Sequence, residues 1–160
     1  MAGGPSVLAL LALLTADGRA AAPGSPAPIL DSRLSGGVRS AVERSFRFAI
    51  RRIGGQRACG GLFARLGAEG AAILAATSYY PATPEQQRRH CHGTTHAFTR
   101  VGDSSVGLCP SFGALSRTEA ALILIHEALH SAGQTEFPSD PAAPDSFGIT
   151  RMVMAGCGLS

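Results

Sequence analysis

The sequence contains no lysine. All 14 basic residues are arginines, and the net charge is +3. Schiff-base catalysis and phosphate binding by a P-loop are excluded, because both depend on a lysine side chain. So small an excess of positive charge does not predict nucleic-acid binding. The arginines at residues 44–52 and 88–89 instead indicate a solvated cationic helix face.

The sequence also lacks an apolar run long enough to cross a membrane. Residues 7–14 are continuously apolar, but these eight residues cannot span a bilayer. Small residues follow, ending at Ala20 or Ala22, and the pattern predicts a secretory signal peptide at residues 1–22, although no basic side chain precedes the run. We expect a secreted or periplasmic protein with no stable membrane insertion after signal removal.

The rest of the chain is expected to form one domain. Residues 23–37 are rich in proline, glycine and serine, which predicts a flexible N-terminal tail. Residues 38–160 are long enough for one modest hydrophobic core.

The four cysteines, Cys59, Cys91, Cys109 and Cys157, include no Cys-x-x-Cys pair. A zinc site made of cysteines is therefore not expected. An even count behind a signal-like segment predicts two disulfides formed in an oxidising compartment. Three connectivities are possible, and we favour Cys91–Cys109, which closes a hairpin region, together with Cys59–Cys157. A nucleophilic cysteine paired with histidine is the less favoured alternative.

The chemistry is concentrated in His126, Glu127 and His130, which form the pattern His-Glu-x-x-His. Residues four apart lie on one face of a helix. The two imidazoles can therefore hold one Zn²⁺ ion, with Glu127 beside them as general base.

The residues around this motif predict a buried helix. Ser116 and Glu119 form a capping box, residues 120–125 are apolar on nearly all sides, and Gly133 is a natural helix stop. Placing two histidines and a glutamate in such an element costs free energy unless a ligand pairs with them, which favours the metal site.

Catalytic zinc takes three protein ligands and leaves one position open. The acids that follow His130 are Glu136, Asp140 and Asp145. We favour Glu136, because Gly133 permits the sharp turn that brings residue 136 back towards the histidines. Asp145 and Asp140 remain alternatives.

With Gly133 and Glu136 included, the stretch resembles the metzincin clan of zinc peptidases, whose motif is HExxHxxGxxH and whose snapalysin-like members end the motif with Asp. This sequence has Glu136 at that position. The resemblance covers about a dozen residues and implies an α+β, zincin-like fold: a small twisted sheet, a scaffold helix and an active-site helix.

Hydrophobic spacing predicts the other elements. Residues 38–53 are expected to form the scaffold helix, residues 59–66 a short helix, and residues 71–80 a strand, with a helix as the alternative for the last segment. Residues 94–101 and 104–109 predict a hairpin. The zincin resemblance implies that a strand beside the active-site helix binds substrate backbone, and this hairpin is the candidate. A last short helix begins at Asp145 or Ser146.

Several other residues are weaker candidates. Tyr79 or Tyr80 could stabilise an oxyanion, but a half-buried aromatic residue is the preferred interpretation. Met152 or Met154 could form the methionine turn that the metzincin resemblance implies, but ordinary packing is preferred. A second metal site is possible at three further histidines, although surface positions are preferred; these are His90, His92 and His96.

The sequence as a whole predicts a secreted zinc-dependent metalloendopeptidase acting on a peptide or protein substrate. Zn²⁺ is the expected cofactor, held by His126, His130 and Glu136, and Glu127 is the expected catalytic base. The alternative is a non-catalytic zincin-fold binding domain or a structural metal domain of the cell envelope. Neither the oligomeric state nor the cleavage specificity is predicted.

Overall fold

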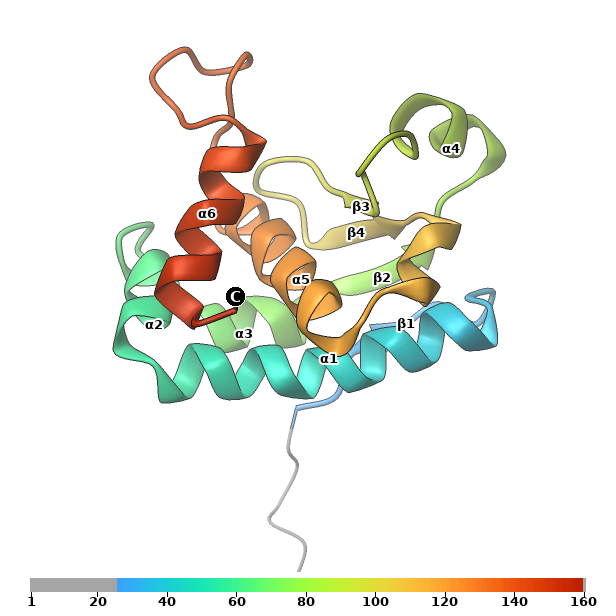
Figure 1. The fold of residues 1–160 in the computed structure, drawn as a ribbon, viewed down its shortest axis with the longest axis horizontal. Helices are drawn as coiled ribbons and strands as arrows, with labels where there is room; N and C mark the ends of the chain where they lie inside the picture. The colour runs from blue at the N-terminus through green and yellow to red at the C-terminus, as the bar shows by residue number, and fades with distance from the viewer. Residues whose placement is uncertain (1–25, 160) are drawn as a thin grey trace, which may run out of the picture.

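The computed structural model describes residues 26–159, and the expected signal peptide lies outside them. The fold is α+β, as expected (Figure 1). In chain order its elements are β1 (Ile29–Leu30), α1 (Gly36–Gly55), α2 (Arg57–Ala64), α3 (Gly70–Ala76), β2 (Ser78–Pro81), α4 (Pro84–His90), β3 (Ala97–Phe98), β4 (Ser105–Leu108), the 3₁₀ helix η1 (Pro110–Ala114), α5 (Arg117–Ser131) and α6 (Ser146–Cys157).

The four strands form one small mixed sheet in the order β1-β2-β4-β3. β1 and β4 both run parallel to β2, whereas β3 and β4 form the expected antiparallel hairpin. One expectation needs correction here. Ile29 and Leu30 fall in the segment predicted to be a flexible tail, but they pair with Ser78 and Tyr79, so the domain begins before residue 38. Backbone pairing with β2 and the packing of Leu30 against the core hold this stretch in place despite its proline-rich composition.

The scaffold helix α1 has 20 residues and is capped at its start by Ser35, whose side chain accepts a hydrogen bond from the Val38 amide. It buries an apolar stripe at helical spacing that includes Val42, Phe46 and Ala49. This stripe packs on α5, and α5 also contacts α3, α6 and β3. Figure 1 shows α1 along one side of the molecule, with α5 crossing it towards the sheet.

The favoured strand at residues 71–80 is wrong in its first half. Gly70–Ala76 form the helix α3, and only Ser78–Pro81 form a strand. Glu69 explains the helix start, because its carboxylate accepts hydrogen bonds from the amides of Ala71 and Ala72. Alanine-rich segments favour helix over strand once such a cap is present.

Both favoured disulfides are confirmed. Cys59 pairs with Cys157 across 98 residues, and Cys91 pairs with Cys109 across 18 residues. The first ties α2 to the end of α6, and the second ties the end of α4 to the end of β4. Two disulfides fit a protein matured in an oxidising compartment. Among residues 26–159, no helix combines the length and the apolar character needed to cross a bilayer.

Candidate metal centre

The helix α5 presents the His-Glu-x-x-His motif in its last turns. The expected capping box starts it: the Ser116 hydroxyl accepts from the Glu119 amide at 3.2 Å, and the Glu119 carboxylate accepts from the Ser116 amide at 2.9 Å. Gly133 follows the helix with φ +106°, a conformation that a residue with a Cβ rarely adopts. The chain therefore reverses directly after the second histidine.

This reversal places Glu136 against the two histidines. The Nε2 atoms of His126 and His130 lie 3.1 Å apart. The Glu136 Oε2 atom lies 3.1 Å from His130 Nε2 and 3.8 Å from His126 Nε2. Both histidines are buried, at 7% and 8% exposure. The three side chains could hold one metal ion between them.

The other ring nitrogen of each histidine has its own partner. His130 Nδ1 lies 2.8 Å from the Gln134 carbonyl oxygen, and His126 Nδ1 lies 3.1 Å from Thr150 Oγ1. Because a carbonyl oxygen only accepts, His130 Nδ1 carries a proton, and in the neutral ring this leaves the lone pair on Nε2, the atom that faces Glu136. Such partners are typical of histidines that bind metals, since they orient the ring and fix its tautomer.

The donor set itself fits a cation. Lone pairs and a carboxylate oxygen converge at close range in a mainly buried place, where their mutual repulsion needs a positive charge to offset it. Two imidazole nitrogens and one carboxylate oxygen suit zinc and other divalent transition metals. Burial and, to a smaller extent, charge repulsion from the nearby His130 lower the pKa of His126 to about 4. The ring is therefore neutral, as a metal ligand must be.

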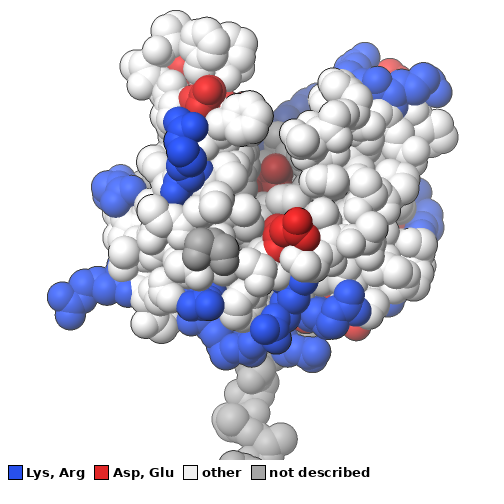
Figure 2. Space-filling view, viewed as in Figure 1, with Lys and Arg blue, Asp and Glu red and all other residues white. Residues whose placement is uncertain are grey.

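Glu127 lies beside this cluster and is 7% exposed. Burial and, to a smaller extent, the charge of Glu136 raise the pKa of Glu127 to about 8, although a hydrogen bond from the Thr99 backbone opposes the rise. Glu127 and His126 both line a cavity of about 420 Å³, with the Leu122 and Ile123 side chains on one wall. Figure 2 shows a hollow between the part carrying α6 and the part carrying α4, with an acidic side chain at its base.

The other acids considered as third ligand have different roles. Asp145 caps α6 by accepting from the Gly148 amide at 2.7 Å. Asp140 accepts from the Thr135 hydroxyl at 2.7 Å and the Ala142 amide at 3.0 Å, and these bonds lower the pKa of Asp140. Of the three acids, only Glu136 joins the two histidines.

The three upstream histidines do not gather into a second metal cluster within the described part of the chain. His96 Nδ1 lies 2.9 Å from Ser111 Oγ at the rim of the 420 Å³ cavity, whereas the His90 ring stacks on Phe98 with centroids 4.6 Å apart. His92 is exposed. The preferred interpretation as surface histidines therefore holds for His92, whereas His90 and His96 are half-buried.

The tyrosine and methionine candidates also have ordinary environments. Tyr79 is 1% exposed, and burial raises its pKa strongly, with Glu127 adding to the rise. Tyr80 lies on the opposite face of the sheet, within hydrogen-bonding distance of Gln86. Met152 and Met154 are both within α6, so neither forms a separate turn. Met152 packs against the core and Met154 is exposed.

Sequence reasoning missed three residues around the motif: Thr99, Gln134 and Thr150. Gln134 acts through its backbone carbonyl and Thr99 through its backbone amide, so their side chains carry no signal. Thr150 is 24 residues from its partner His126. The sequence does contain one indication of its position. Thr150 lies one helical turn before the apolar Val153, so both residues share the face of α6 that packs against α5.

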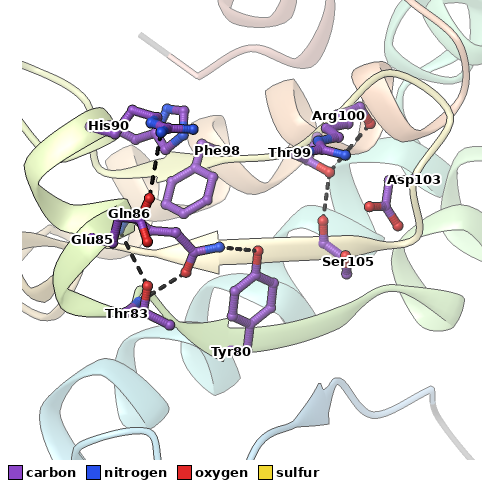
Figure 3. A pocket seen from close by; sticks show the side chains of 11 residues that line it. Tyr80, Thr83, Glu85, Gln86, His90, Phe98, Thr99, Arg100, Asp103 and Ser105 are labelled. Atoms are coloured by element: carbon purple, nitrogen blue, oxygen red, sulfur yellow. Dashed lines mark hydrogen bonds and ion pairs between the residues drawn. The ribbon is translucent and has the colours of Figure 1, made fainter.

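A larger cavity, of about 530 Å³, lies on the other face of β3 and away from the metal cluster (Figure 3). The aromatic side chain in its wall, Phe98, already packs against other residues of the protein on both of its faces. The Phe98 ring stacks under His90 on one side and covers Gly107 on the other, where an added Cβ would lie 2.3 Å from the ring. We therefore assign the chemistry to the smaller cavity, which contains His126 and Glu127.

No protein-family model, no curated protein and no solved structure matches this chain significantly. The site must therefore be interpreted from its own geometry.

Proposed function

We propose that this protein is a secreted, zinc-dependent endopeptidase with a zincin-like fold. One observation carries the proposal: His126, His130 and Glu136 bring three ligand atoms together, and Glu127 lines the same cavity as His126. A site that only holds a metal has no need of a second acidic side chain facing the cleft, whereas a hydrolase needs a base there.

The chain's own residues divide the work of peptide hydrolysis. His126, His130 and Glu136 would hold the metal, with Thr150 and the Gln134 carbonyl orienting the imidazoles. A bound zinc would supply Lewis acidity, which polarises a carbonyl group and makes nearby water more acidic.

Glu127 is placed to move the proton. Its carboxylate takes a proton from the water that attacks the scissile carbonyl carbon, and it passes that proton to the amide nitrogen as the C–N bond breaks. The nearly buried position of Glu127 excludes bulk water from this transfer. The Thr99 backbone lowers the pKa of Glu127 and so favours the charged form that accepts a proton.

The free edge of β3 supports binding of an extended substrate. β3 is an edge strand, and the Cys109 amide donates to the His96 carbonyl at 3.0 Å. In an antiparallel pair with this pattern, the amide and carbonyl of the next residue, Ala97, point away from β4. These groups can pair with the backbone of a substrate strand, next to the cavity that contains Glu127.

The test is hydrolysis of an unstructured protein, such as casein, by the oxidised and zinc-loaded protein. We expect Glu127→Gln to retain zinc but lose nearly all turnover, about 10²-fold or more, because the variant lacks the proton acceptor. Glu43→Gln, at an exposed position on α1, is the matched control and should remain active.

Two outcomes would contradict the proposal. Turnover retained by Glu127→Gln would remove the assigned base. A wild-type protein that binds zinc but neither hydrolyses peptides nor binds a hydroxamate would favour a non-catalytic metal domain, because a hydroxamate needs an open coordination position.

A further inference from the structure

Three guanidinium groups converge on one aromatic ring at the surface of α1. The Cζ atoms of Arg52 and Arg117 lie 4.8 Å and 4.7 Å from the Phe48 ring centroid, and that of Arg51 lies 5.8 Å from it. Arg51 and Arg52 come from the last turns of α1, and Arg117 begins α5. Tertiary packing of α5 on α1 thus adds a third positive charge to a pair that is adjacent in sequence.

These charges have no carboxylate partner within residues 26–159. The arginines that form ion pairs in this region are Arg33 and Arg89, and none of the ion pairs involves the three arginines at Phe48. Glu43 is exposed on α1, and the Glu119 carboxylate is already used by the capping box. The ring offsets part of the repulsion among the guanidinium groups by cation–π attraction, but only by about 0.5–1 kcal/mol each at exposed positions.

An unpartnered buried donor provides a second, independent observation. In the described part of the chain, the Nε atom of Arg52 is buried and has no hydrogen-bond partner. A buried N–H without an acceptor is costly. Arg51 and Arg117 are exposed and Arg52 as a whole is half-buried, so solvent and ligands can reach the group to which this buried donor belongs.

We propose that Arg51, Arg52 and Arg117 form a binding site for a phosphate or sulfate group. Guanidinium forks bind tetrahedral oxyanions through paired hydrogen bonds. Three forks carry more positive charge and more donors than a single carboxylate can use, and they match a dianion with four oxygens. The anion is either a free phosphate or the phosphate of a lipid headgroup, since the chemistry of recognition is the same.

The site lies apart from the metal cleft. Figure 1 shows α1 on the side of the molecule opposite α4 and the loop that precedes α6, and Figure 2 shows basic side chains gathered over that side. An anion bound at this surface leaves the cavity with His126 and Glu127 open. The inference is therefore independent of the proposed hydrolase activity.

The test is calorimetric titration of the full mature chain with inorganic phosphate at physiological ionic strength, and flotation with vesicles. The vesicles are made of phosphatidylcholine alone or mixed with phosphatidylglycerol. Arg51→Gln with Arg117→Gln should weaken phosphate binding about tenfold or more, because each removes charge-assisted hydrogen bonds. The Arg52 Nε–H resonance should shift in the wild type on addition of phosphate.

The matched control is Arg65→Gln with Arg88→Gln, which removes the same charge from two exposed positions elsewhere. Phosphate binding without vesicle binding supports a free anion, and phosphatidylglycerol-dependent flotation that the first variant loses supports a headgroup. Equal loss in both double variants, or no binding of either probe by the wild type, would overturn the proposal. Unchanged melting curves of the variants exclude loss of folding as the cause.

Discussion

His126 and His130 face each other through their Nε2 atoms at 3.1 Å, while their Nδ1 atoms bond to Thr150 and to the Gln134 carbonyl. The partners of the Nδ1 atoms thus orient the two rings, and the Nε2 atoms, which face each other, are left to bind a ligand. Helical spacing explains why the rings are neighbours. Their orientation comes from α6 and from the turn after α5.

Glu136 should determine whether the metal is retained. We expect about one zinc per chain in the wild type and a lower content, with loss of hydrolysis, in Glu136→Ala. Elemental mass spectrometry after dialysis measures this directly. Asp140→Asn is the control, because Asp140 bonds within its own loop. Equal zinc in Glu136→Ala and wild type would exclude Glu136 as a ligand.

Thr150 should tune the affinity without abolishing it. Thr150→Val keeps the shape of the side chain but removes the oxygen that contacts His126 Nδ1. Loss of such an outer partner lowers metal affinity by about 10–100-fold, which competition with a zinc chelator measures. Ser139→Ala, at an exposed loop position, should bind zinc like the wild type. An unchanged affinity in Thr150→Val would mean that α6 does not orient the ligand.

The two disulfides should differ in their contribution to stability. In the chain-entropy description, a bridge across 98 residues stabilises by about 5 kcal/mol and one across 18 residues by about 3 kcal/mol. Urea unfolding of Cys59→Ala/Cys157→Ala should therefore show the larger loss in free energy of unfolding, and each double variant is the control for the other. A larger loss in Cys91→Ala/Cys109→Ala would contradict this order.

Asp31 should make stability fall in acid. Hydrogen bonds from the Arg33 side chain, then from its amide, lower the pKa of Asp31 from 3.8 to about 2. Because the folded-state pKa is depressed, the stabilisation is complete above the unfolded-state pKa of about 4 and is lost as the pH falls towards 2.

Unfolding measured between pH 5 and 2 should thus show a flatter acid limb in Asp31→Asn than in the wild type. Arg33 is exposed and Asp31 is partly exposed, so added salt should reduce the difference. Asp103→Asn, at another exposed position, serves as control. Parallel acid limbs in Asp31→Asn and wild type would show that the Arg33 contact does not contribute.

Much of the candidate site could be predicted because its signals are local. The capping box at Ser116, the apolar run and the two histidines all lie within one helix, and each acts over four residues or fewer. The disulfide pairing was predicted from the hairpin position and by elimination. The favoured strand at residues 71–76 was wrong, because the hydrophobic pattern of a short apolar segment fits a helix and a strand equally well. The cap formed by Glu69 decides for the helix.

The sequence by itself determined that α5 exists, where it begins, and that His126, Glu127 and His130 share its buried end, because helix geometry follows from neighbours along the chain. Only the tertiary structure decided that Glu136, rather than Asp140 or Asp145, completes the cluster. It also decided that Thr150 orients His126, that Thr99 reaches Glu127, and that Arg117 joins the arginines of α1. These contacts join segments that are far apart in the sequence. Tertiary packing brings them together, and local sequence periodicity carries no information about it.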